Sequence, residues 1–379
     1  MILILTPDVD STSPEYGKLM EYLSNLKGIQ FRLHREHGEQ QVLTEVYLVG
    51  DTASLSVEDM QRLPCVERVV KVSQDYRVLG QHKGERRSTW FEYNGVRFGQ
   101  DNLNIFAGLC AVDTREHVEM MMKALQDNGQ ICTRMGAYKP RTNPYSFQGH
   151  GRDCLPYVFE LAGKYGIKVI AMEITHESHI EEINEALERT GHPTGVMLQI
   201  GTRNTQNFEL LKFVGRQHEL PVLFKRGFGI TLAESLNAAE YLASEGNRKV
   251  VFGLRGMKTS LGEPHRNFVD FAHVPAIKRL TRMPVCIDPS HSVGSRAADP
   301  DGIMDLQHVT AQGVIAGANM VLVDFHPVPA QALVDGPQAL TLKELPWFLE
   351  DVRIAREAYE RRLKLAREHH ASSESSGRT

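Results

Sequence analysis

Short apolar runs alternate with amphipathic segments between Asn104 and Asp324, and this alternation limits the folds available to the chain. The apolar runs lie at 104–110, 131–134, 168–173, 196–200, 221–224, 249–252, 284–288 and 320–324. Segments with helical spacing lie between them, among them 117–125, 155–164, 180–187, 208–216 and 232–243. Eight successive strand–helix units predict an α/β fold of the (β/α)8 TIM-barrel type. An open doubly wound sheet seldom needs so many units, and no Gly-x-Gly-x-x-Gly follows the first run.

The first 75 residues have a different pattern. Strands are predicted at 1–6, 29–34, 43–49 and 66–72, with helices at 14–26 and 57–63. This βαββαβ order is typical of a ferredoxin-like domain. Because no histidines, cysteines or acids cluster there, we expect regulation or assembly from this domain rather than catalysis.

We therefore predict four segments: a ferredoxin-like domain at 1–75, a linker at 76–103, the barrel at 104–352, and a final segment at 353–379. The linker is polar and contains a small hairpin predicted at 90–93 and 96–98. The final segment is predicted to be a charged helix, followed by a disordered tail at 371–379.

Composition excludes several classes of protein. Five scattered cysteines without Cys-x-x-Cys spacing argue for a reducing cytoplasm and against disulfides or a structural zinc site. No apolar run is long enough to span a membrane, and the N-terminus does not resemble a signal peptide. A net charge of −4 gives no support to a nucleic-acid partner. Any anion that the protein binds must therefore bind in a local basic pocket.

Seven cations follow the predicted strands, at the end of a barrel where catalytic residues lie. They are Arg134, Lys139, Arg141, Arg203, Lys225, Arg226 and Arg255. The stretch 134–151 contributes three of them, beside prolines and glycines that fix the backbone; alone, it is equally consistent with a solvated basic loop. Since converging like charges repel by several kcal/mol, we expect a substrate with more than one phosphate or carboxylate.

A second group at the same rim combines a thiol, an imidazole and two carboxylates. It consists of Cys110, His291, Asp324 and Asp335. Taken singly, these residues have ordinary structural interpretations: a small buried side chain, a loop histidine and helix caps. Together, they form a mixed S/N/O site suited to a divalent transition metal rather than calcium.

The motifs at these strand ends resemble those of 3-deoxy-D-arabino-heptulosonate 7-phosphate (DAHP) synthases of the type I beta group, in the DAHP and 3-deoxy-D-manno-octulosonate 8-phosphate synthase superfamily. The resemblance covers about residues 104–345 in order, and the N-terminal domain also belongs to that group. It rests on Ala107-Gly-Leu-Cys-Ala-Val, Lys139-Pro-Arg-Thr-Asn-Pro-Tyr-Ser-Phe-Gln-Gly, Gln199-Ile-Gly-Thr-Arg-Asn, Lys225-Arg-Gly, Leu254-Arg-Gly, Asp288-Pro-Ser-His, Phe325-His-Pro and Asp335-Gly-Pro-Gln.

The resemblance implies an enzyme, a transferase that condenses phosphoenolpyruvate with erythrose 4-phosphate in the first step of aromatic amino acid (shikimate) biosynthesis. The residues that it assigns to phosphoenolpyruvate are Arg134, Lys139, Arg203, Lys225 and Arg255. Arg141 and Thr142 would hold the aldose phosphate, and Lys139 would transfer a proton. Cys110, His291, Asp324 and Asp335 would bind manganese, iron, zinc or cobalt, so that Cys110 and His291 count with Lys139 as catalytic. A cytoplasmic homotetramer or homodimer is implied, with no membrane partner, and relatives carry feedback inhibition by aromatic amino acids on the N-terminal domain.

Several positions depart from the family pattern. Asp324 stands where the family has a metal-binding glutamate, and Leu109, Thr202 and Leu254 replace proline, alanine and glutamate. Three interpretations follow: a shikimate-pathway synthase with tolerated changes, a paralogue that uses another aldose phosphate or aldehyde in specialised metabolism, or a catalytically silent regulatory homologue.

Overall fold

The computed structural model describes residues 1–37, 42–52, 55–70, 76–82 and 90–376, and the statements below concern these residues. The chain divides into two compact units. One consists of Met1–Arg77 with His82–Glu85, and the other of Val78–Gln81 with Arg86–Thr379. Among the described residues, none of the helices combines the length and the apolar character needed to cross a membrane.

The N-terminal unit has the predicted ferredoxin-like order. Its four strands β1 (Ile2–Leu5), β2 (Ile29–His37), β3 (Val42–Gly50) and β4 (Val66–Val70) form an antiparallel sheet in the order β2-β3-β1-β4. Two helices connect them, α1 (Pro14–Ser24) and α2 (Val57–Gln61). Leu3, Leu5, Leu19 and Leu23 are buried in a core of their own between helix and sheet, which explains why this unit is compact by itself.

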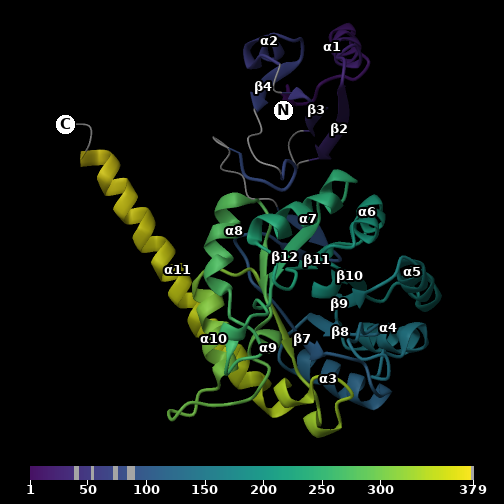
Figure 1. The fold of residues 1–379 in the computed structure, drawn as a ribbon, viewed down its shortest axis with the longest axis vertical. Helices are drawn as coiled ribbons and strands as arrows, with labels where there is room; N and C mark the ends of the chain where they lie inside the picture. Colours follow the sequence, from purple (N-terminus) through teal and green to yellow (C-terminus); the bar gives the residue numbers. More distant parts are fainter. Residues whose placement is uncertain (38–41, 53–54, 71–75, 83–89, 377–379) are drawn as a thin grey trace. The chain divides into compact units, whose positions relative to one another are not determined.

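The second unit contains the predicted barrel, closed by eight parallel strands (Figure 1). They are β7 (Asn104–Leu109), β8 (Cys132–Met135), β9 (Val169–Ile174), β10 (Gly195–Ile200), β11 (Val222–Lys225), β12 (Val250–Leu254), β13 (Val285–Ile287) and β14 (Met320–Asp324). β14 pairs with β7 and closes the ring. The strands are buried almost throughout, which is why their sequences read as unbroken apolar runs.

Helices surround the barrel, and several of them begin at a residue whose side chain caps them. They are α3 (Arg115–Asp127), α4 (Leu155–Lys164), α5 (Ser178–Thr190), α6 (Phe208–Arg216), α7 (Leu232–Ser244), α8 (Val274–Leu280), α9 (Pro289–Val293) and α10 (Asp305–Ile315). The Thr114 side chain accepts from the backbone N–H of His117 at the start of α3, and Thr231 forms a capping box with Glu234 at α7.

A hairpin closes the end of the barrel at which the strands begin. β5 (Phe91–Tyr93) pairs with β6 (Val96–Phe98), as predicted within the polar connector. Phe98 is buried and packs with Phe106 and other residues inside the barrel, and the Tyr93 hydroxyl accepts from the backbone N–H of Val196 at 3.0 Å. Because this end is filled, the open pocket of the barrel lies at the opposite rim.

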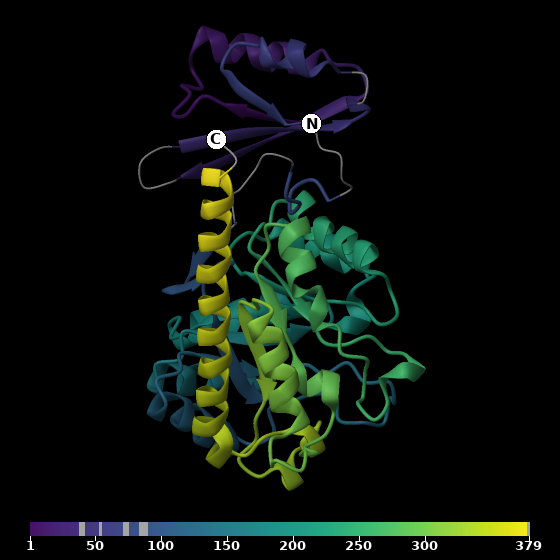
Figure 2. The same cartoon turned by 90° about the vertical axis from the view of Figure 1, so that its left-hand side faces the viewer.

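The C-terminal helix α11 (Leu345–Ser376) lies along α10 on the outside of the barrel (Figure 2). The predicted boundary at residue 353 falls inside this helix, and most of the predicted disordered tail, as far as Ser376, is helical. Residues 377–379 lie outside the described part of the chain, and the limits of the four predicted segments stay predictions.

Candidate active site

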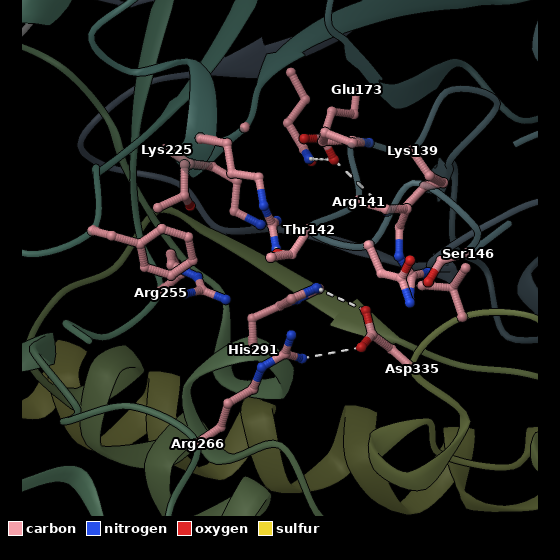
Figure 3. A pocket seen from close by; sticks show the side chains of 18 residues that line it. Lys139, Arg141, Thr142, Ser146, Glu173, Lys225, Arg255, Arg266, His291 and Asp335 are labelled. Carbon is pink, nitrogen blue, oxygen red and sulfur yellow. Dashed lines mark hydrogen bonds and ion pairs between the residues drawn. The ribbon is translucent and has the colours of Figure 1, made fainter. Parts of the chain in front are cut away.

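A pocket at the carboxyl ends of the strands collects most of the predicted cations around a cavity of about 280 Å³. Lys139, Arg141, Arg203, Lys225 and Arg255 all line it. Lys225 and Arg255, which end β11 and follow β12, lie across the cavity from Lys139 (Figure 3). The parallel strands end at one rim, so that side chains distant in sequence converge there.

Buried acids neutralise part of this charge. Lys225 forms an ion pair with Asp288, and both side chains are almost fully buried. The Lys139 Nζ lies 3.6 Å from Glu173 Oε2 and 3.3 Å from Cys110 Sγ. Burial alone would lower the pKa of Lys139, but Cys110 and Glu173 raise it overall. Lys139 is therefore an ammonium at neutral pH.

Other cations of the pocket are short of hydrogen-bond acceptors. Arg255 is 3% exposed, yet its Nε and Nη1 atoms have no partner among the described residues, and neither has Nη1 of Arg141. Arg203 donates to the Thr142 hydroxyl at 3.0 Å. Buried guanidinium groups without acceptors are poised for an anion from solution.

Two of the seven predicted cations do not line the pocket. Arg134 lies behind it, where Nη1 donates to Asp324 Oδ1 at 2.6 Å and Nη2 approaches Cys110 Sγ at 3.6 Å. Arg226 turns away and pairs with buried Asp270 at 3.0 Å, so the expectation that it joins the convergent group is wrong. A polar residue next to a strand end can face the helices as readily as the rim, and the sequence does not distinguish the two.

The four predicted metal-binding residues lie together. One possible ligand atom from each of Cys110, His291, Asp324 and Asp335 can be chosen so that all lie within 4.8 Å of one another. His291 Nε2 is 3.8 Å from the Cys110 sulfur and 3.4 Å from Asp335 Oδ2. Its Nδ1 contacts Asp288 Oδ1 at 3.0 Å, which leaves Nε2 to face the thiol. A soft sulfur, an imidazole and carboxylates fit a divalent transition metal.

The charges within this cluster reinforce one another. Burial alone would lower the pKa of His291, but the carboxylates of Asp288 and Asp324 raise it to about 10. Burial would likewise raise the pKa of Asp335, yet His291 and Arg266 hold it well below the ordinary range. A divalent metal held by Cys110, His291, Asp324 and Asp335 would take the place of the imidazole proton, beside a carboxylate that is already ionised.

Two residues beside the cluster were not predicted. Arg266 donates to Asp335 Oδ1 at 3.0 Å and to the Gln338 amide oxygen at 3.1 Å, and His291 and Arg266 both reach Asp335 in Figure 3. Gln338 in turn donates to Asp324 Oδ2 at 2.5 Å. Gln338 belongs to a motif that the sequence offers, Asp335-Gly-Pro-Gln, whereas Arg266 lies in a long loop without a strand end to mark it.

A second cluster ties together the loops that carry the site. His326 Nδ1 accepts from the backbone N–H of Val328, so its Nε2 carries the proton and donates to Asp113 at 2.7 Å. His117 contacts the same oxygen of Asp113 at 2.8 Å, and His150 contacts the Asp113 carbonyl. With these hydrogen bonds made, the cluster joins the loops after β7, β8 and β14 and is structural.

Comparison with known proteins agrees with this arrangement. The family model described as "DAHP synthetase I family" matches residues 40–360. Phospho-2-dehydro-3-deoxyheptonate aldolase of Thermotoga maritima is 33% identical over 353 residues, covering 93% of this chain and 97% of that protein. Its crystal structure superposes with a TM-score of 0.68 at 31% identity, over 94% of this chain and 97% of the other. A 2-dehydro-3-deoxyphosphooctonate aldolase of Rhodopseudomonas palustris is 29% identical over 66% of this chain and 86% of its own.

Fold and site thus define a TIM-barrel enzyme whose cationic pocket adjoins a Cys/His/Asp cluster. The chain belongs to the DAHP synthetase I family and is a transferase of the DAHP synthase type. The resemblance inferred from the strand-end motifs is confirmed, including its wider superfamily. The roles of the individual residues stay predictions.

Gly201 provides a test of the packing beside Lys139. A Cβ at position 201 would lie 1.8 Å from Glu173 Oε1, so Gly201→Ala must displace that carboxylate. We expect a loss of about 1–3 kcal/mol in the free energy of unfolding. Glu173→Ala should relieve most of this loss in the double variant, as measured by urea unfolding of all four proteins. Strict additivity of the two single losses would contradict the predicted contact.

Asp113 provides a test that depends on pH. Burial would raise the pKa of Asp113, but hydrogen bonds from His326, His117 and Thr114 lower it to about 2. A lowered pKa stabilises the fold above about pH 4, and this contribution is lost as the pH falls towards 2. Asp113→Asn should therefore lower the free energy of unfolding by about 1–3 kcal/mol at pH 7 and pH 5 alike. A deficit that already disappears by pH 5 would refute the assignment.

Proposed function

We propose that this protein condenses phosphoenolpyruvate with erythrose 4-phosphate to give DAHP and inorganic phosphate. The observation that carries the proposal is the cationic pocket directly beside the Cys110–His291–Asp335 cluster, with two Arg255 nitrogens that have no hydrogen-bond partner among the described residues. Two mutually repelling anions need such a pocket to reach reacting distance. The T. maritima relative, which is named for the same product, supports the choice of reaction.

The phosphoenolpyruvate subsite consists of Arg134, Lys139, Arg203, Lys225 and Arg255. Lys225 and Arg255 line its inner wall, and Arg134 lies behind it against Asp324. Arg141 and Thr142 hold the phosphate of the aldose at the mouth of the pocket, where Arg141 retains an unpartnered nitrogen. Pro140, between the two sets, fixes their separation because its ring restricts the backbone.

Cys110, His291, Asp324 and Asp335 would hold a divalent metal, namely manganese, iron, zinc or cobalt. When bound, such an ion supplies Lewis acidity that polarises the aldehyde carbonyl. His291 offers Nε2 because Asp288 occupies Nδ1, and Arg266 holds Asp335 Oδ1 while Oδ2 faces the sulfur. These contacts orient the ligands before a metal arrives.

Lys139 is placed to supply a proton. Carbon 3 of phosphoenolpyruvate forms the new bond to the aldehyde carbon, whose oxygen becomes an alkoxide and takes a proton from the Lys139 ammonium. Water then adds to the positive charge left at carbon 2, and the proton that it releases restores the Lys139 ammonium. The bond between carbon 2 and the phosphate oxygen breaks as the new hydroxyl becomes a ketone, and its proton leaves with the phosphate. The Lys139 Nζ lies between Cys110 and Glu173, within reach of the metal cluster and the pocket alike.

A different aldose phosphate is the second candidate, favoured by the changes at the site itself. Thr202 lines the pocket and Leu254 is fully buried at the end of β12, directly before Arg255, where the family has alanine and glutamate. We still prefer the shikimate-pathway function, because the residues assigned to both phosphate groups are all present. Cytoplasmic location, a homotetramer or homodimer, and feedback through the N-terminal unit accompany the proposal as family expectations.

Phosphate release distinguishes the two candidates. Purified protein with manganese and phosphoenolpyruvate should release inorganic phosphate with erythrose 4-phosphate faster than with ribose, arabinose or amino-sugar phosphates. Mass spectrometry of the product checks that it is DAHP. Turnover of another aldehyde without turnover of erythrose 4-phosphate would transfer the assignment to a specialised paralogue.

Cys110 tests whether the chain is a catalytically silent homologue. Cys110→Ala should lose more than about 100-fold in activity and the thiolate-to-metal absorption of the cobalt-loaded protein. Cys132→Ala, a buried cysteine in the barrel core, is the matched control and should keep both. Wild-type protein without bound transition metal would favour the silent homologue, and an active Cys110→Ala variant would refute the metal site.

A further inference from the structure

The Arg255 guanidinium is buried without the hydrogen bonds that its charge requires. Two of its nitrogens lack partners among the described residues. Burial lowers the pKa of Arg255, and the nearby Arg266 and Arg203 lower it further, against the effect of Asp288. A guanidinium nevertheless stays charged in a protein. These two nitrogens have no acceptor within the described part of the chain, so a contact of another kind with this chain would help to hold the group in place.

The ring of Phe228 meets that need. Phe228 lies in the loop between β11 and α7 and lines the same pocket. The Cζ atom of Arg255 lies 4.8 Å from the ring centroid, and that of Arg203 lies 5.7 Å from it. Both distances fall within the cation–π range of about 6 Å. One ring thus contacts two guanidinium groups that repel each other.

The loop that carries this ring is anchored from inside the protein. Arg226 donates through Nη2 to the carbonyl of Ile230 at 3.2 Å, and through Nη1 to Asp270. Its backbone N–H donates to the Gly253 carbonyl at 2.8 Å. A Cβ at Gly227 would lie 2.7 Å from Ile230 Cδ1 and 3.2 Å from Thr205 Cβ, so glycine lets the turn pack closely against both side chains. Arg226, which does not reach the pocket, thereby fixes the position of Phe228.

We propose that Phe228 is a positioning residue of the phosphoenolpyruvate subsite, whose ring holds Arg203 and Arg255 in place for one anion. This inference rests on the proposed function, because that function assigns the two arginines to phosphoenolpyruvate. A ring that fixes both groups in advance reduces the ordering that binding would otherwise require. Arg203 also donates to Thr142, so the ring stands at the junction of the two subsites.

Calorimetric titration of the full-length protein with phosphoenolpyruvate, without the aldose, tests the ring separately from turnover. Phe228→Leu keeps apolar bulk but removes the ring, and its Kd should rise by about 3- to 30-fold. Phe228→Tyr should bind within about twofold of wild type, because it restores the ring. Phe228→Met, a second variant without a ring, should have a Kd similar to that of Phe228→Leu. In both variants the steady-state KM for the aldose phosphate should change less than the KM for phosphoenolpyruvate.

Phe208→Leu is the matched control, since Phe208 stacks on Tyr241 at 4.8 Å on the outer helices. It should bind phosphoenolpyruvate as wild type does. In an Arg255→Gln background the effect of Phe228→Leu should shrink, because the ring acts through that guanidinium.

Two results would overturn the proposed role of Phe228 without affecting the proposed function. One is an unchanged Kd for phosphoenolpyruvate in both Phe228→Leu and Phe228→Met; the other is an effect of Phe228→Leu that does not shrink in the Arg255→Gln background. Wild-type protein that binds phosphoenolpyruvate but turns over no aldose phosphate would overturn the proposed function, while the binding data would still judge Phe228. Failure of the wild type to bind phosphoenolpyruvate would overturn both.

Discussion

Positive charge converging on one end of the barrel is the constraint on which the site depends. Like charges this close repel strongly at the intermediate dielectric of a protein pocket, and burial adds a desolvation penalty to each. Arg134 and Lys225 each pair with an acid two strands away in the barrel, Arg134 with Asp324 and Lys225 with Asp288. Arg255 is equally buried, forms no ion pair among the described residues, and faces the cavity. The number of acids thus sets how much charge remains for a substrate.

These pairs depend on where the barrel places residues without side chains. Gly108 pairs in register with Arg134 on one side and with Asp324 on the other, so the ion pair forms across it. A Cβ there would lie 2.2 Å from the Arg134 carbonyl. Gly201 leaves comparable space for Glu173 beside Lys139. Gly108 within β7 thus lets the backbone of Arg134 approach closely, and Gly201, directly after β10, leaves room for the Glu173 carboxylate.

The barrel could be predicted because its strands are buried on both faces, and each lies within two residues of the expected limits. Cys110, His291, Asp324 and Asp335 could be grouped because parallel strands end at one rim. The sequence does not show, however, in which direction a side chain beside a strand end points. Arg226 follows Lys225 directly, yet one faces Asp270 and the other the pocket. Arg266 and Phe228 lie on loops whose path depends on tertiary contacts, such as the backbone bond from Arg266 to Val293.

The shorter acid at position 324 is best understood through its neighbours. Asp324 is fully buried, with Oδ1 bound to Arg134 and Oδ2 to Gln338, while His291 Nδ1 lies 3.7 Å away. A glutamate side chain would be one methylene longer. The shorter aspartate can act as a ligand only if the surrounding groups hold its carboxylate in the right position. Arg134 and Gln338 do so, and Arg266 connects Gln338 to Asp335. One continuous hydrogen-bond network therefore positions the carboxylates of both Asp324 and Asp335. A longer or shorter side chain at position 324 would, through this network, also affect the position of Asp335.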